Sequence, residues 1–190
     1  MDNKSTDTSA YCDDIRRAID VMNRGGIIAY PTDTIWGLGC DATNADAVRR
    51  IYEIKRRDDS KALITLVDSE AKVEFYVKEV PEVAWQLIEV ADKPLTIIYD
   101  NARNLAPNLI AEDGSIAIRI TSEPFSRELC RRFKKAIVST SANVSGEPSP
   151  KTFADISSEI LNAADYVCTS RRNENAPHTP SSIIKLGVSG

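Results

Sequence analysis

The chain has 190 residues and a formal net charge of −4 at neutral pH, with 42% hydrophobic and 27% charged residues. This composition is typical of a soluble globular domain, and it argues against a disordered chain or a globally basic nucleic-acid coat protein. No stretch approaches the roughly 18 apolar residues that a membrane-spanning helix needs, and the first residues lack the apolar core of a signal peptide. We therefore expect a cytoplasmic protein with a flexible N-terminus at 1–8 and one domain at 9–190.

The scarcity of histidine and cysteine removes two classes of chemistry. The single histidine, His178, lies in a polar segment, and the four cysteines contain no CxxC pair. A tetrahedral zinc site or a histidine-based catalytic triad is therefore disfavoured, and we expect no metal bound by protein side chains. The thiols are more typical of small buried side chains.

Hydrophobic spacing predicts helices and strands that mostly alternate along the chain. Two places, however, allow one strand to follow another directly. The pattern indicates a single α/β domain with a twisted, mostly mixed sheet, helices on both faces and a ligand cleft at strand ends. In chain order we expect a helix near 15–22 capped by Gly25, a strand at 27–30, a helix from Asn44 to Lys55, a strand at 62–67, helices at 69–76 and 81–90, strands at 95–99 and 115–120, a helix at 124–133, a strand at 136–140, a capping box at Thr152 and Asp155, and strands at 165–168 and 182–186.

Four of the eight glycines fall between Gly25 and Gly39, around the run Pro31-Thr32-Asp33-Thr34. Exposed amides and hydroxyls in a tight turn at a strand edge can hold a small polar ligand. A β-bulge or a hairpin with ordinary turn residues explains the same pattern equally well. The sequence leaves these two interpretations open.

Basic residues gather at the end of the helix that closes with Lys55-Arg56-Arg57, and Lys61 follows soon after. The helix dipole favours one or two cations there, so the full cluster suggests a polyphosphate ligand. Neither a P-loop nor a G-x-G-x-x-G turn is present. A second basic run, 127–135, is more typical of a solvated helix face.

Small polar residues follow the strand predicted at 136–140, from Ser139 to Gly146. Hydroxyls and an amide at a strand's carboxyl end suit phosphate or ribose, although a capping loop is the alternative. On the strand at 115–120, Ser115 and Arg119 share one face. A buried arginine needs an anion, which either a carboxylate ligand or a structural Asp or Glu would provide.

Five segments together resemble the YrdC/TsaC family of threonylcarbamoyl-AMP synthases, in its short single-domain form. The resemblance runs from about Asp13 to Leu186. Each segment alone is a weak signal, whereas five in this order are a strong one. The segments are 25–39, Lys55-x-Arg57 with Lys61, 116–119, Ser139-Thr140-Ser141-Ala142-Asn143-x-Ser145-Gly146, and 180–183.

The resemblance implies a nucleotidyltransferase that converts L-threonine, bicarbonate or CO2, and ATP into threonylcarbamoyl-AMP and pyrophosphate. Mg2+ would be carried on the phosphates, and a TsaD-containing complex would use the product to modify tRNA beside the anticodon. Lys55 and Arg57 would be the catalytic pair. By motif position, ATP would contact Lys55, Arg57, Lys61, Ser115, Ser141, Asn143 and Ser149, and threonine would contact Thr32, Arg119, Ser139 and Ser181.

Three departures from the family pattern bear on the ATP site. Asp92-Lys93-Pro94 stands where the family has Pro-Gly-Pro, Asp58 replaces a proline, and Asn175 to Thr179 replaces a glycine-rich lead-in. Two alternative functions remain: a non-catalytic module that binds tRNA or double-stranded RNA, and a carbamoyltransferase paralogue. A weak contact with tRNA is compatible with the first and with the synthase.

Overall fold

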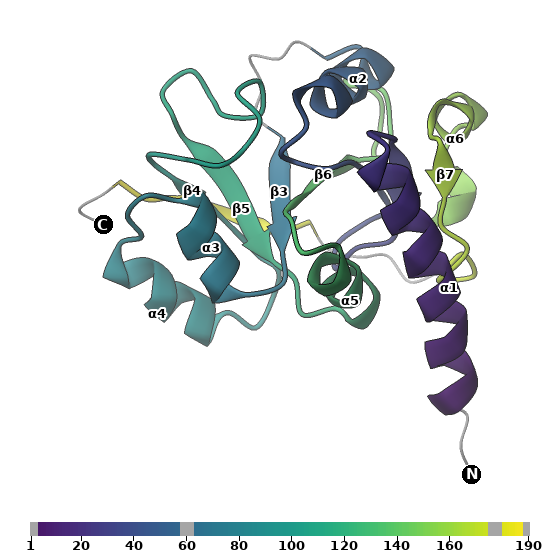
Figure 1. The fold of residues 1–190 in the computed structure, drawn as a ribbon, viewed down its shortest axis with the longest axis horizontal. Coiled ribbons are helices and arrows are strands. Elements are labelled where there is room, and N and C mark those ends of the chain that lie inside the picture. Colours follow the sequence, from purple (N-terminus) through teal and green to yellow (C-terminus); the bar gives the residue numbers. More distant parts are fainter. Residues whose placement is uncertain (1–3, 58–62, 175–179, 188–190) are drawn as a thin grey trace.

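The computed structural model describes residues 4–57, 63–174 and 180–187, with side chains from residue 11 onward. Helices and strands alternate through most of this part of the chain (Figure 1). The elements are α1 (Lys4–Asn23), β1 (Ile28–Tyr30), β2 (Gly37–Gly39), α2 (Ala45–Lys55), β3 (Ile64–Val67), α3 (Glu70–Tyr76), α4 (Glu82–Val90), β4 (Leu95–Tyr99), β5 (Ile116–Ile120), α5 (Pro124–Phe133), β6 (Ile137–Ser141), the 3-10 helix η1 (Phe153–Asp155), α6 (Ser158–Ala163), β7 (Tyr166–Val167) and β8 (Ser182–Lys185).

The described strands form one eight-stranded sheet in the order β7-β1-β2-β6-β3-β5-β4-β8. β1 pairs with β7, β3 with β5, and β4 with β8 in parallel, whereas the other four neighbouring pairs are antiparallel. The predicted mixed sheet is therefore confirmed. β2 follows β1 and β5 follows β4 with no helix between them, and each of these two pairs is antiparallel.

Capping residues set the ends of several helices. The Asn44 side chain accepts hydrogen bonds from the amides of Asp46 and Ala47 and so begins α2, as predicted. Helix α1 ends at Asn23 and is followed by Gly25, whose φ of 81° lets its amide donate to the carbonyl oxygen of Met22. Its first residue, Lys4, lies within the segment expected to be a flexible N-terminus. The predicted capping box at Thr152 is present, and it begins the short η1.

The glycine-rich run forms the β1–β2 hairpin, so the predicted hairpin is present. Thr34, Ile35 and Gly37 of the same run also line a cavity, so the two interpretations of the sequence do not exclude each other. A Cβ added at Gly39 would lie 2.5 Å from the Tyr30 ring and 2.8 Å from the Val138 carbonyl oxygen. At Gly37 it would lie 2.8 Å from the Thr140 carbonyl oxygen. Glycine is therefore required because β2 lies directly against both neighbouring strands. Residues 31–36 form the loop that joins the two strands of the hairpin.

The sheet separates two cavities. Side chains alternate along a strand, so Thr96 and Ile98 of β4 face one cavity, while Ile97 and Tyr99 face the other. Helix α1 packs on β1, β7 and α5, and α5 also packs on β3. In Figure 1, α2 and α5 lie at opposite ends of β3. None of the helices in the described ranges is both long and apolar enough to cross a membrane.

Candidate functional site

A cavity of about 410 Å³ lies on one face of the central sheet, and we call it the hydroxyl cavity. Its floor comes from six neighbouring strands, β2, β6, β3, β5, β4 and β8. The loop between β1 and β2 and the segments after α2 and before β8 complete its walls. The lining residues are Thr34, Ile35, Gly37, Arg57, Leu63, Ile64, Thr96, Ile98, Ala117, Arg119, Ser139, Thr140, Ser141, Ser149, Pro180, Ser181 and Ile183.

Strand register brings the polar side chains of the cavity floor together. Arg119 of β5 is directly opposite Thr96 of β4. The Thr96 hydroxyl is hydrogen-bonded to the Ser181 hydroxyl at 2.7 Å. On β6, Ser139 and Ser141 are two residues apart and both line the cavity. A guanidinium and several hydroxyls thus converge on a space large enough for a small ligand.

Six of the predicted site residues line the hydroxyl cavity. They come from both predicted subsites, so the structure brings the expected phosphate-binding and amino-acid-binding groups into one space. They are Arg57, Arg119, Ser139, Ser141, Ser149 and Ser181. Lys61 lies outside the described residues.

Thr32 and Ser115 lie elsewhere and are occupied by local contacts. The Thr32 hydroxyl donates to the Ile35 carbonyl oxygen at 2.7 Å and accepts from the Thr34 amide, so it shapes the turn after β1. The Ser115 hydroxyl donates to Asp113 at 2.6 Å. Both residues are almost fully buried, and neither lines the hydroxyl cavity. In this structure their side chains stabilise turns beside the site.

Lys55 lies behind the cavity wall and is only 1% exposed. Its ammonium group donates to the carbonyl oxygens of Ser141 at 2.6 Å and Asn143 at 2.8 Å, and more weakly to the Ser141 hydroxyl. Burial, with repulsion from Arg57, lowers the pKa of Lys55 to about 8. Lys55 therefore holds the turn after β6 in place from behind.

Asn143 lies in that same turn. Its side-chain amide donates to the carbonyl oxygens of Val144 and Glu147, at 3.1 and 2.8 Å. Its Oδ1 atom is buried and accepts no hydrogen bond from the described residues. An unsatisfied buried acceptor is uncommon in folded proteins, and a donor on a ligand is one way to satisfy it.

Arg119 has a structural acid partner. Its guanidinium forms a buried ion pair with Asp33, with 2.9 Å between Nη2 and Oδ1. The sequence left open whether a ligand or a protein carboxylate would balance this arginine. The structure shows a protein carboxylate, while the arginine still lines the hydroxyl cavity.

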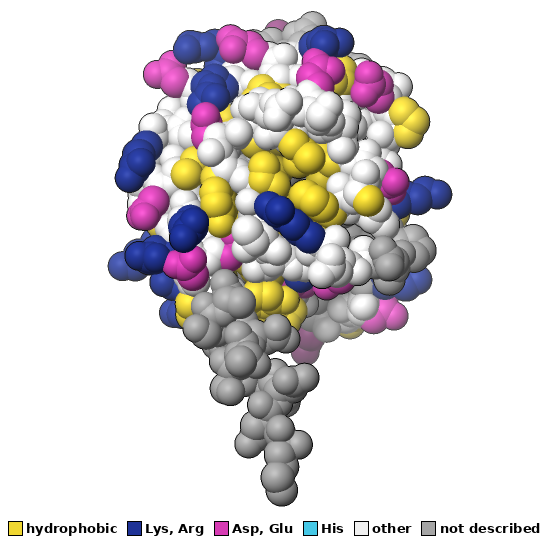
Figure 2. Space-filling model, turned by 90° about the vertical axis from the view of Figure 1, so that its right-hand side faces the viewer, with side chains coloured by type: hydrophobic (Ala, Val, Ile, Leu, Met, Phe, Trp, Pro, Cys, Tyr) yellow, Lys and Arg dark blue, Asp and Glu magenta, His cyan; other side chains and the backbone are white. Residues whose placement is uncertain are grey.

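Both predicted basic clusters contain cations that pair with acids. Arg56 pairs with Glu159, Arg131 with Glu128 and Lys135 with Asp41. On the face that carries α6 and β7, Lys and Arg side chains lie among Asp and Glu side chains around a hydrophobic centre (Figure 2). These contacts favour the interpretation of 127–135 as a solvated helix face.

A family model described as "Telomere recombination", for Sua5, YciO and YrdC proteins, matches residues 20–190. The chain belongs to this family. A Vibrio cholerae protein named threonylcarbamoyl-AMP synthase is 32% identical over 177 residues, which is 92% of this chain and 93% of that protein.

Two solved structures of this Sua5/YciO/YrdC family have the same fold. P. abyssi Sua5 complexed with L-threonine has a TM-score of 0.80 and 28% identity, and the match covers 90% of this chain. This chain spans only half the length of that Sua5 chain. E. coli YciO has a TM-score of 0.79 and 22% identity, with 91% of this chain and 84% of that chain covered.

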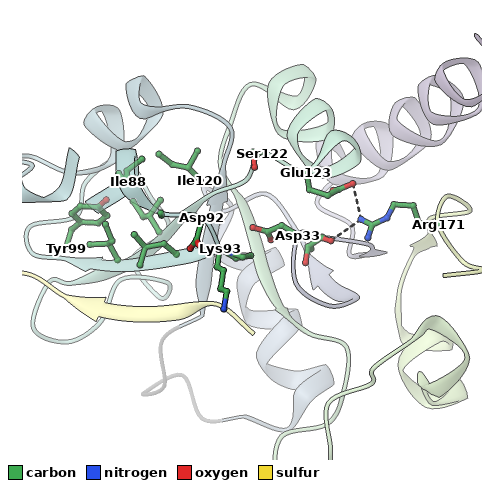
Figure 3. A pocket seen from close by; sticks show the side chains of 15 residues that line it. Asp33, Ile88, Asp92, Lys93, Tyr99, Ile120, Ser122, Glu123 and Arg171 are labelled. Carbon is green, nitrogen blue, oxygen red and sulfur yellow. Dashed lines mark hydrogen bonds and ion pairs between the residues drawn. The ribbon is translucent and has the colours of Figure 1, made fainter. Parts of the chain in front are cut away.

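A second cavity of about 460 Å³ lies on the opposite face of the sheet in this family member, and we call it the isoleucine cavity (Figure 3). Its floor is apolar, from Ile97 and Tyr99 of β4 and Ile118 and Ile120 of β5. Arg171 lies at one end, where it is 3.0 Å from both Glu123 and the Thr32 carbonyl oxygen. This contact ties the loop after β1 to the start of α5.

Thr34 and Thr96 line the hydroxyl cavity but were not among the predicted site residues. For Thr34 a signal existed, because the run 31–34 was already singled out as a possible ligand turn. Thr96 lies in a strand that reads as apolar, from Leu95 to Tyr99. Only the pairing of β4 with β5 and β8 shows that its hydroxyl lies beside Arg119 and Ser181.

Proposed function

We propose that this protein is an L-threonylcarbamoyladenylate synthase, a nucleotidyltransferase. The observation that carries the proposal is the convergence of Arg57, Arg119 and the hydroxyls of Ser139, Ser141 and Ser181 on one cavity. The relatives named threonylcarbamoyl-AMP synthase and the threonine complex of Sua5 support it. L-threonine, bicarbonate and ATP would give threonylcarbamoyl-AMP, pyrophosphate and water.

The chemistry needs alignment and charge neutralisation more than a nucleophilic side chain. Bicarbonate takes up a proton and loses water to give carbon dioxide, and the threonine amine adds to the carbon dioxide to form a carbamate and release a proton. A carbamate oxygen then attacks the α-phosphorus of ATP while pyrophosphate leaves. Two anions must approach each other, so cations and Mg2+ carried on the phosphates lower the barrier. A TsaD-containing complex that modifies tRNA would then consume the product.

The cavity residues divide into two groups by their chemistry. Arg57, Ser141 and Ser149 suit the triphosphate, and the unsatisfied Oδ1 of Asn143 suits a donor on the nucleoside. Arg119, Ser139 and Ser181 suit the threonine carboxylate and hydroxyl. Lys55 contributes by fixing the turn that carries Ser141 and Asn143, through the two backbone carbonyls it binds.

The adjacent arginines Arg56 and Arg57 offer a matched test. Arg57 lines the cavity, whereas Arg56 is exposed and pairs with Glu159. We expect Arg57→Ala to lower kcat/KM for ATP by about 100-fold, because a charge-assisted contact to phosphate is lost, and Arg56→Ala to change it less than twofold. Mass spectrometry of threonylcarbamoyl-AMP and a pyrophosphate assay give the rates. Pyrophosphate release that does not depend on threonine would overturn the proposal.

A further inference from the structure

The ion pair between Arg119 and Asp33 links the central sheet to the loop after β1. Nε of Arg119 donates to both carboxylate oxygens of Asp33, at 3.0 and 3.1 Å. Nη2 lies 2.9 Å from Oδ1 and also donates to the Thr34 hydroxyl at 3.4 Å. The two side chains are 3% and 9% exposed. One whole edge of the guanidinium is thus held by the protein.

The opposite edge of the guanidinium is not held in this way. Nη1 of Arg119 makes no hydrogen bond to any group in residues 4–57, 63–174 or 180–187. Arg119 lines the hydroxyl cavity, whereas Asp33 lines the isoleucine cavity on the other face of the sheet. Figure 3 shows Asp33 beside the polar end of that second cavity. The carboxylate therefore holds the guanidinium from the side away from the proposed ligand.

This arrangement has an energetic consequence for ligand binding. A free arginine side chain loses rotamer entropy when a ligand immobilises it. Asp33 has already immobilised Arg119, so a ligand carboxylate meets a donor of fixed direction. Asp33 also balances the buried charge, which would otherwise be costly without a ligand.

We propose that Asp33 is a positioning residue for amino-acid binding. It holds Nε and Nη2 of Arg119 so that Nη1 remains directed at the threonine carboxylate in the hydroxyl cavity. The proposal rests on the proposed function, and it assigns no contact between Asp33 and the substrates. Asp33 would therefore affect threonine affinity through Arg119 and leave ATP affinity nearly unchanged.

Threonine affinity of an Asp33→Asn variant tests this role. Asparagine keeps the shape and one acceptor but cannot hold both guanidinium nitrogens as a carboxylate does. We expect calorimetry to show threonine binding at least 10-fold weaker, with KM for ATP changed less than twofold. In an Arg119→Ala background, Asp33→Asn should have no further effect on threonine binding, because the residue through which it acts is gone.

Asp41→Asn provides the matched control. Asp41 is also a buried carboxylate that pairs with a cation, Lys135, but it lines neither cavity. It should lower stability without changing threonine affinity. If Asp33→Asn does not fold, Asp33→Glu replaces it, because glutamate keeps the charge but moves the carboxylate by one methylene group and so changes the direction in which the guanidinium is held. Wild-type threonine affinity in either folded variant would overturn the positioning role alone. Failure of the wild-type protein to bind threonine would overturn the proposed function as well.

Discussion

Lys55 and Arg57 lie two residues apart at the end of α2 but have different environments. Arg57 lines the hydroxyl cavity, whereas the Lys55 ammonium group is buried against the turn after β6. The sequence predicted them as a catalytic pair. In this structure, one side chain lines the cavity and the other supports the backbone that carries Ser141.

The titration of Lys55 gives a prediction about stability. Burial and Arg57 lower its pKa to about 8 in the folded protein, below its ordinary value of 10.5. Between these two pH values the unfolded chain binds more protons than the folded one, so the free energy of unfolding rises with pH, by at most about 1.4 kcal/mol per unit. Below pH 8, Lys55 is protonated in both states, so its contribution to the free energy of unfolding does not change with pH.

A Lys55→Met variant lacks this group and therefore lacks the rise. Urea denaturation of both proteins from pH 7 to 10 measures the difference between their free energies of unfolding. The titrations of all other groups cancel in this difference. We expect the stability of the wild type relative to the variant to increase above pH 8. A flat or falling difference would contradict the burial of the ammonium group.

Thr96 tests the amino-acid end of the cavity. Thr96→Val removes the hydroxyl that bonds to Ser181 and should raise KM for threonine by about 3- to 10-fold, as expected for one neutral hydrogen bond. Thr65→Val is the control, because the buried Thr65 hydroxyl has no hydrogen-bond partner among the described residues. Thr65 is in register with Ile118, which faces the isoleucine cavity and not the hydroxyl cavity. Steady-state kinetics should show a change only for Thr96. Equal effects in both would remove Thr96 from the site.

At the scale of elements, the β1–β2 hairpin determines where the ligand loop lies. Its strands have only three residues each, and β2 reads Gly-Leu-Gly. Such a segment has little intrinsic strand preference. Its place in the sheet depends on the close approach of Tyr30 and Val138, which leaves no room for a side chain at Gly39.

Gly39→Ala should therefore destabilise the protein by about 1–3 kcal/mol, because the added methyl group meets a ring and a backbone carbonyl. Gly187→Ala is the matched control, because a Cβ atom added at Gly187 would lie 3.8 Å from a carboxylate oxygen of Asp100, which is an ordinary contact. Thermal unfolding measures both. A melting temperature for Gly39→Ala equal to that of Gly187→Ala would show that β2 does not pack as described.

Over the whole molecule, the sheet separates two cavities of similar size, one lined by hydroxyls and arginines and the other with an isoleucine-rich floor and charged side chains at its edge. Local patterns predicted the class of fold and most elements, because apolar spacing and caps such as Asn44 act within a few residues. They also predicted Arg57, Arg119 and Ser139 as site residues. Contacts between distant segments decided the rest: the register that places Thr96 beside Arg119, the Asp33 partner, and the burial of Lys55.

The central claim is that threonine and ATP bind together in the hydroxyl cavity. A crystal structure of the protein with L-threonine and a non-hydrolysable ATP analogue tests it most directly. We expect the threonine carboxylate at Arg119 and the phosphates at Arg57, on the face of β4 that carries Thr96. Ligand density in the isoleucine cavity alone, or phosphates bound away from Arg57, would contradict the account.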